Sequence, residues 1–103
     1  MIKFDPSVDL LEEVKDYIGI SWQDDNTDRK TAGYIARGVS RLERISGIHL
    51  NFEEEGLPKS LLLDYCRYAN SQALEVFERN FQDELLDLNL AAAVKEYEDK
   101  NTN

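Results

Sequence analysis

The first hydrophobic pattern along the chain predicts a short helix over about residues 9–18. Its apolar residues recur at helical intervals along one face: Leu10, Leu11, Val14, Tyr17 and Ile18. Asp9 is placed to cap the start of this helix, with Glu12 three residues further on, and Gly19 is placed to end it. The exposed side of the predicted helix is acidic, and it carries Asp9, Glu12, Glu13 and Asp16.

A longer pattern predicts a second helix over about residues 26–46. One face is apolar, with Ala32, Ile35, Val39 and Leu42. The opposite face is basic, with Lys30, Arg37, Arg41 and Arg44. Asp25 or Asn26 is placed to cap this helix, and Gly47 to end it. Gly33 and Gly38 each cost about 1 kcal/mol of helix stability relative to alanine, which favours close packing against a neighbour at these positions.

The next pattern predicts an extended or short β-like loop over residues 48–57, followed by a third helix over about residues 58–81. In the loop, apolar residues alternate with polar ones, and the apolar ones are Ile48, Leu50 and Phe52. Pro58 is well placed as the first residue of the third helix. Beside its wide core face this helix carries a second apolar stripe of Leu63, Leu74 and Phe81. We expect this surplus to be an interface between subunits, because two short partner helices cannot cover it.

The remaining residues predict a flexible C-terminal segment. Leucines alternate with polar residues as on a strand edge, at Leu86, Leu88 and Leu90. Residues 91–100 are fair helix formers, and residues 101–103 are expected to be disordered. We therefore predict an all-α protein, a small bundle of three main helices in a domain over residues 1–82, with a segment over residues 83–103 that could become ordered on assembly.

The charge distribution leaves three interpretations of the basic helix face. The 103-residue chain has a net charge of −9, yet residues 29–47 carry five basic side chains and one acidic one. The basic face could be a solvated surface, a contact with the acidic face of the first helix in another copy, or a DNA contact. Four cations on so acidic a chain make a weak DNA binder, so we rank self-assembly above DNA binding.

Few residues suggest catalysis or ligand binding. His49 precedes three glutamates without the spacing of metal ligands, which is typical of an acidic surface loop. Cys66 lies on the predicted core face, and a lone cysteine fits a reducing compartment. We find no phosphate-binding loop, no nucleophile motif and no apolar run long enough to span a membrane. We therefore expect no enzyme activity, no metal and no cofactor.

The order of these segments resembles a known family. A short helix with the sequence LLEEVKDYIGI is followed by the acidic loop DDNTD, a long helix ending in ISGI, a loop entering LPKSL, and a last apolar helix. This order resembles the head–tail connector proteins of tailed bacteriophages, also called adaptor or head-completion proteins. It is most similar to the adaptors of long, non-contractile-tailed phages of Gram-positive hosts, over about residues 8–82.

The resemblance implies a structural function in the virion, at the head–tail interface, with the subunit in the host cytoplasm during assembly. It implies a ring of about a dozen copies beneath the portal vertex, closed by contacts between identical chains. The ring would extend the channel for double-stranded DNA, without sequence-specific binding, and contact the portal protein above and a stopper or tail-completion protein below. We expect the C-terminal segment to dock on the portal. The alternative is a small helical regulatory or DNA-associated module that uses the basic helix face.

Overall fold

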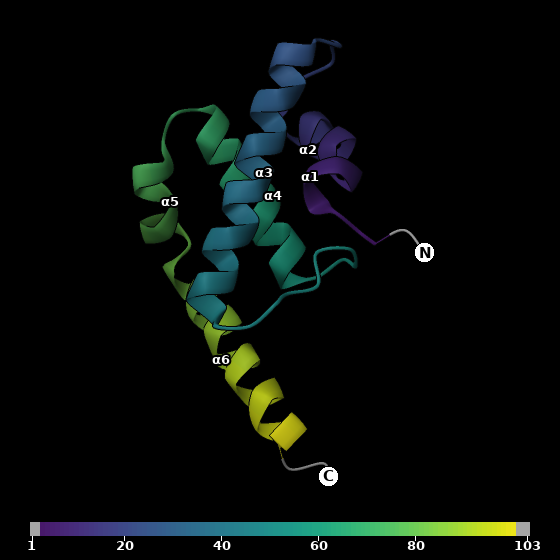
Figure 1. The fold of residues 1–103 in the computed structure, drawn as a ribbon. Coiled ribbons are helices and arrows are strands. Elements are labelled where there is room, and N and C mark those ends of the chain that lie inside the picture. Colours follow the sequence, from purple (N-terminus) through teal and green to yellow (C-terminus); the bar gives the residue numbers. More distant parts are fainter. Residues whose placement is uncertain (1–2, 101–103) are drawn as a thin grey trace.

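The computed structural model describes residues 3–100, and this part of the chain forms six helices without a strand (Figure 1). The helices are α1 (Pro6–Asp9), α2 (Leu11–Ile18), α3 (Asp25–Ser46), α4 (Leu57–Asn70), α5 (Leu74–Asn80) and α6 (Gln82–Lys100). Helices α3 and α4 pack against each other at the centre, with α1 and α2 on one side and α5 on the other. The predicted all-α class is confirmed. None of the helices within the described residues is long and apolar enough to cross a membrane.

The N-terminal helix is divided in two. Asp5 caps the short helix α1, because its carboxylate accepts a hydrogen bond from the backbone N–H of Ser7 at 3.1 Å. The predicted first helix therefore begins two residues late, at Leu11. Asp9 does not cap it, since its carboxylate instead accepts the backbone N–H of Asp5 at 2.7 Å. Gly19 ends α2 as predicted, in the left-handed conformation with φ of 86°.

The long helix α3 agrees closely with its prediction. Its cap is Asp24, one residue before the predicted Asp25 or Asn26, and the Asp24 carboxylate accepts the backbone N–H of Thr27 at 3.0 Å. The same carboxylate accepts the Thr27 hydroxyl at 2.8 Å. Gly47 ends the helix as predicted, with φ of 83°.

The two glycines inside α3 lie in different surroundings. A Cβ at Gly38 would lie 2.7 Å from Cδ1 of Leu62 and 2.8 Å from Cδ1 of Tyr65, both on α4. The predicted close packing is therefore confirmed at Gly38, where the two central helices meet. The atoms nearest to a Cβ at Gly33 belong to the side chain of Arg37, with Nη1 at 3.3 Å.

The loop between α3 and α4 is held to the body by both apolar and polar contacts. Phe52 is buried, and Ile48 and Leu50 are half-buried. The carboxylate of Glu43 on α3 accepts the backbone N–H of Leu50 at 2.9 Å. The apolar residues that suggested an extended or β-like segment thus attach a loop to the core, with no strand formed among the described residues.

The prediction of one helix over residues 58–81 is wrong. The chain leaves the helix at residues 71–73, where Gln72 has φ of 56°, and then forms the separate helix α5. The break turns α5 back along α4, so that the Phe77 ring packs edge-on to Tyr65 with centroids 5.4 Å apart. Burial of this large ring outweighs the strain at a non-glycine residue with positive φ.

Residues 83–100, the described part of the segment predicted to be flexible, form most of helix α6. The buried residues of α6 recur at helical intervals: Leu85, Leu88 and Ala92. The alternating leucines do not form a strand edge, because a strand needs a partner strand whereas a helix satisfies its own backbone hydrogen bonds. Residues 101–103, predicted to be disordered, lie outside the described residues.

Candidate interaction surfaces

Three of the four cations of the predicted basic face are exposed to solvent, and the fourth is half-buried. Lys30, Arg37 and Arg44 are exposed on α3, whereas Arg41 is half-buried. The Arg37 guanidinium lies over the Tyr34 ring, 5.6 Å from its centroid. Within residues 3–100, none of the three exposed cations forms an ion pair. We call Lys30, Arg37 and Arg44 the basic ridge.

Arg41 instead links α3 to α5. Its Nε donates to Oε2 of Glu78 at 2.7 Å, and its Nη2 donates to Oε1 at 2.8 Å. This two-point contact holds the pKa of Glu78 below its usual value. The sequence shows no local sign of this pair, because the two residues are 37 positions apart.

We predict that replacing Arg41 with methionine will raise the pKa of Glu78 towards that of an ordinary glutamate. A carboxylate with a lowered pKa stabilises the folded state above its unfolded pKa, about 4.3, and this contribution is lost as the pH falls through the lowered folded value. At neutral pH the loss should be at most about 1 kcal/mol, because the pair is more than a third exposed and screened by solvent. The difference in stability between the two proteins should shrink as the pH falls through the lowered folded pKa of Glu78.

NMR titration of the Glu78 side chain measures the first effect, and urea unfolding at several pH values measures the second. Arg44→Met is the control, since Arg44 lies on the same helix without touching Glu78. An unchanged pKa of Glu78 in the Arg41 variant would contradict the assignment.

The predicted acidic face is partly neutralised within the same chain. Two lysines, Lys15 and Lys59, are 1% and 6% exposed. Lys15 Nζ lies 2.8 Å from Oδ1 of Asp28 and 3.9 Å from Oε2 of Glu12. Lys59 Nζ lies 3.0 Å from Oε1 of Glu13 and also contacts Glu55. Three of the four residues of the face are therefore already engaged, Glu12 and Glu13 by lysines and Asp9 by the backbone. Asp16, the fourth, is exposed.

The three residues of the predicted apolar interface do not form one stripe. Leu63 and Phe81 are half-buried against the core, and Leu74 is 37% exposed at the start of α5. The break after α4 separates them, and α5 and α6 of the same chain pack on α4 where a neighbouring subunit was expected.

Helix α6 carries several exposed large apolar side chains. Of the predicted docking residues, Leu88 is buried and Leu86 and Leu90 are 57% and 53% exposed. Val94 and Tyr97 continue the exposed line at 56% and 70%. These four residues have spacings of four, four and three, so they share one face of the helix. We call them the apolar stripe. The helical spacing of these four residues is present in the sequence. The alternation of Leu86, Leu88 and Leu90 favoured a strand instead, so the stripe was not predicted from the sequence.

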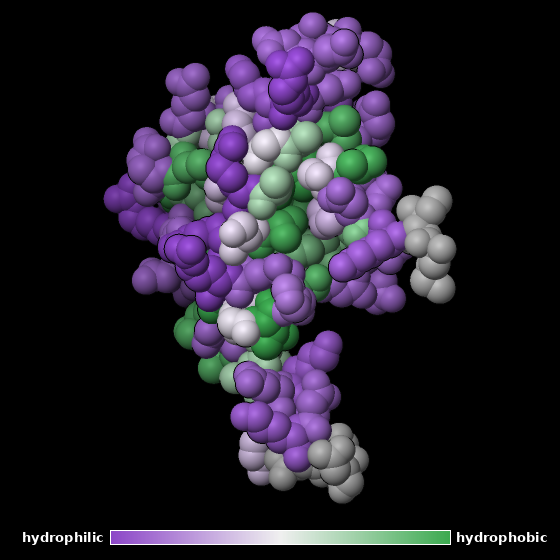
Figure 2. Space-filling model, in the orientation of Figure 1, coloured by the Kyte–Doolittle hydropathy of each residue, from purple (hydrophilic) through white to green (hydrophobic). Residues whose placement is uncertain are grey.

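The apolar stripe continues onto a part of α6 that leaves the body. Ala92 is the last buried residue, and residues 93–100 are all exposed. Figure 1 shows this end of α6 beyond the other helices, and in Figure 2 it stands clear of the rest of the surface. At the base of α6, a groove of about 470 Å³ opens beside Leu86, between α6, α5 and the end of α3. It is lined by Ile45, Glu78, Arg79, Gln82, Leu85, Leu86 and Asn89.

The two residues considered for catalysis or metal binding, His49 and Cys66, lie in different surroundings. The His49 side chain is fully exposed, with Nδ1 3.4 Å from Oε1 of Glu43. Cys66 is buried, and burial raises the pKa of its thiol to about 12, so the thiol is protonated at neutral pH. Among residues 3–100, no three His, Cys, Asp or Glu side chains come together as metal ligands.

The arrangement therefore presents two solvent-facing surfaces suited to protein contacts, the basic ridge on α3 and the apolar stripe on α6. Both lie on helices, so their side chains are held in fixed relative positions. Comparison with protein-family models, curated proteins and solved structures found no match to this chain.

Proposed function

We propose that this chain is a structural adaptor of a tailed bacteriophage, which assembles as a ring beneath the portal vertex and extends the DNA channel. The proposal starts from the order of sequence segments that resembles this family. In this role the protein acts by binding other subunits. It would also provide the docking surface for the next stopper or tail protein.

The observation that carries the proposal is the apolar stripe of α6. Four large apolar side chains, each more than half exposed, lie in a row on a helix that leaves the body. Isolated exposed apolar residues are common, but a continuous row marks a protein interaction surface. A projecting helix with one apolar face is suited to packing against another protein.

The net charge of −9 supports the same role. A ring of acidic subunits around a channel repels DNA phosphates and keeps the duplex from adhering to the wall. Arg41 is occupied by Glu78, which leaves three exposed cations on the basic face, and a contact that neutralises so few phosphates binds DNA weakly at physiological salt. The charge thus favours the adaptor over the DNA-associated module.

Co-sedimentation with portal-bearing phage heads tests the proposal. We expect the purified protein to pellet with heads that carry a portal and to remain in solution with heads that lack one. Leu86→Glu/Leu90→Glu should abolish the association, because two charges in the apolar stripe oppose burial. Val8→Glu is the control, since Val8 is 67% exposed but lies on α1.

Failure of the wild-type protein to associate with portal-bearing heads would overturn the adaptor role. A shift of duplex DNA at physiological salt, lost in Arg37→Glu/Arg44→Glu, would instead favour the DNA-associated module. Under the adaptor proposal we expect no such shift.

A further inference from the structure

We propose that the apolar stripe of α6 packs on α3 of a second copy of this chain, with acidic side chains beside the stripe facing the basic ridge. The contact rests on the proposed function, since it joins neighbouring subunits of the ring. It goes further by naming which surfaces meet. Each subunit would offer α6 to one neighbour and α3 to the other, which is the head-to-tail arrangement that closes into a ring when the rotation allows.

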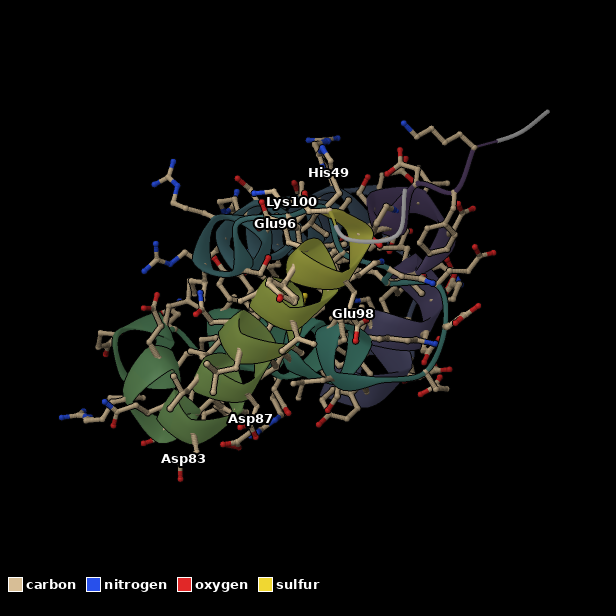
Figure 3. All side chains as sticks on the ribbon, turned by 90° about the horizontal axis from the view of Figure 1, so that it is seen from below. His49, Asp83, Asp87, Glu96, Glu98 and Lys100 are labelled. Carbon is tan, nitrogen blue, oxygen red and sulfur yellow. The ribbon has the colours of Figure 1, made fainter. Side chains whose placement is uncertain are left out.

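The two surfaces carry opposite charges. Residues 82–100 hold six acidic and two basic side chains. Three of the acids, Asp83, Asp87 and Glu98, fall on or beside the apolar stripe at the helical step of about 100° per residue. Figure 3 shows all three on α6, seen from below. Within residues 3–100 neither these acids nor the cations of the basic ridge form ion pairs, so both sets are available to a partner.

The two surfaces also match in length. The cations of the basic ridge are spaced seven residues apart, so they form a nearly straight line about 21 Å long. From Asp83 to Glu98 along α6 is about 22 Å. Two helices crossing at about 20° remain in contact over such a distance. The two outer cations can therefore lie opposite Asp83 and Glu98 at once, while Arg37 lies about 4–5 Å along the helix axis from the level of Asp87.

Gly33 belongs to a row of small residues on α3 against which a partner helix could pack closely. Beside the basic ridge, Gly33, Ala36 and Ser40 recur at helical intervals, and Ala36 and Ser40 are exposed. Gly38 is explained within the chain by its contact with Leu62, whereas the three atoms nearest to a Cβ at Gly33 all belong to the exposed side chain of Arg37. A glycine that weakens a helix without an internal reason is expected where another backbone or large side chain approaches closely. In the proposed contact, the leucine, valine and tyrosine side chains of the apolar stripe lie against this row of small residues.

Other pairings of the same surfaces are less favourable. Two α6 helices packed on each other would bring their acidic flanks together, and like charges across an interface are repulsive. The acidic face around α2 is a weaker partner for the basic ridge than the sequence suggested. Glu13 lies 3.0 Å from the buried Lys59 of its own chain, and Asp28 at the start of α3 lies 2.8 Å from the buried Lys15.

Two variants, each lacking one surface, test the contact by sedimentation velocity. The ridge variant is Arg37→Glu/Arg44→Glu, and the stripe variant is Leu90→Glu/Val94→Glu. All four positions are exposed, so both variants should fold, which circular dichroism checks. Lys3→Glu/Arg67→Glu is the control for the ridge variant, because it changes the net charge by the same amount at exposed positions outside α3 and α6.

We expect the wild-type protein to associate increasingly up to about 1 mM at low salt, and less at high salt. Each variant alone should associate at least about tenfold more weakly, and the control should behave as the wild type. Mixed together, the two variants should form one-to-one heterodimers and nothing larger. The ridge variant still offers α6 and the stripe variant still offers α3, so a single contact forms and cannot propagate.

Three results would overturn the contact. These are a wild-type protein that stays monomeric throughout, a mixture that forms no heterodimer, and a ridge variant that still self-associates while the stripe variant does not. The last would indicate pairing of α6 with α6.

Gly33→Ala adds a check without a charge change, since it should weaken association while leaving the fold at least as stable.

The contact and the adaptor role can fail separately. If the mixed variants form heterodimers but the wild-type protein does not sediment with portal-bearing heads, the subunit contact stands and the adaptor role fails. If the protein binds the heads and the mixture remains monomeric, the adaptor role stands and this contact is wrong.

Discussion

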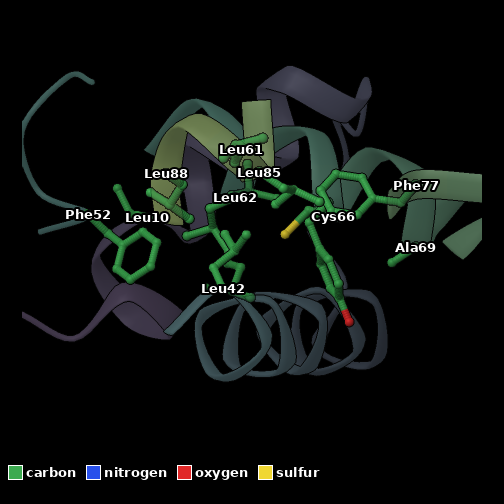
Figure 4. Packing of buried hydrophobic residues seen from close by; sticks show 13 residues of the cluster. Leu10, Leu42, Phe52, Leu61, Leu62, Cys66, Ala69, Phe77, Leu85 and Leu88 are labelled. Carbon is green, nitrogen blue, oxygen red and sulfur yellow. The ribbon is translucent and has the colours of Figure 1, made fainter. Parts of the chain in front are cut away.

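Replacing Phe77 with alanine is expected to lower the free energy of unfolding by about 3–5 kcal/mol. The side chain is 1% exposed, and its ring packs edge-on to Tyr65 and Tyr68 with centroids 5.4 and 5.7 Å apart. Figure 4 shows it towards one end of the buried cluster, where α5 meets the core. A domain of this size is stabilised by about 5–15 kcal/mol, so much of the stability would be lost. Urea unfolding followed by circular dichroism measures the change.

The matched control is Leu74→Ala on the same short helix. Leu74 is 37% exposed, so its truncation should cost less than about 1 kcal/mol. Equal losses for the two variants would mean that α5 contributes through its helix as a whole and that Phe77 is not its anchor.

Gly38→Ala is expected to destabilise the protein by about 1–2 kcal/mol, although the same change at an open helix position is stabilising. The added methyl group would lie within 2.8 Å of both Leu62 and Tyr65. Both neighbours are buried, with 0% and 8% exposure, so neither side chain can move aside without disturbing the core. Overpacking therefore outweighs the gain in helix propensity. Thermal and urea unfolding measure the sign of the effect.

Gly33→Ala, in the same helix, should have the opposite sign. Its nearest neighbour is the exposed end of Arg37, which can move, so the variant should gain up to about 1 kcal/mol. Stabilisation at both glycines would show that α3 and α4 are less tightly packed at Gly38 than the distances indicate.

The helices that could be predicted from the sequence are those whose ends are set by local chemistry. Asp24 and Gly47 bound α3, and Gly19 ends α2, because capping side chains and left-handed glycines act within a few residues. The division after α4 had no such signal. Gln72 adopts positive φ at a position without glycine or proline, and the reason lies in the packing of Phe77 against residues of α4. Tertiary packing of this kind is not encoded locally.

The candidate surfaces, like the helices, could be predicted from the sequence only in part. The cations of α3 follow from helical spacing, and Lys30, Arg37 and Arg44 are exposed on one helix as expected. Arg41, however, pairs with Glu78, which is 37 positions away in the sequence. Helical periodicity cannot detect a contact of this kind. On α6, Leu88 faces the core while Leu86 and Leu90 face solvent, because the segment is apolar on two sides. A helix apolar on two sides has a weak periodic signal, and alternation of its leucines then resembles a strand.

The helical state of α6 has a thermodynamic consequence for assembly. Residues 93–100 have no buried side chain, yet they already form the end of a helix in the single chain. Ordering a flexible segment on binding costs about 1–2 kcal/mol per residue in backbone conformational entropy. A segment that is helical beforehand avoids most of that loss, so under the proposed subunit contact a smaller buried area would suffice to hold a neighbouring copy.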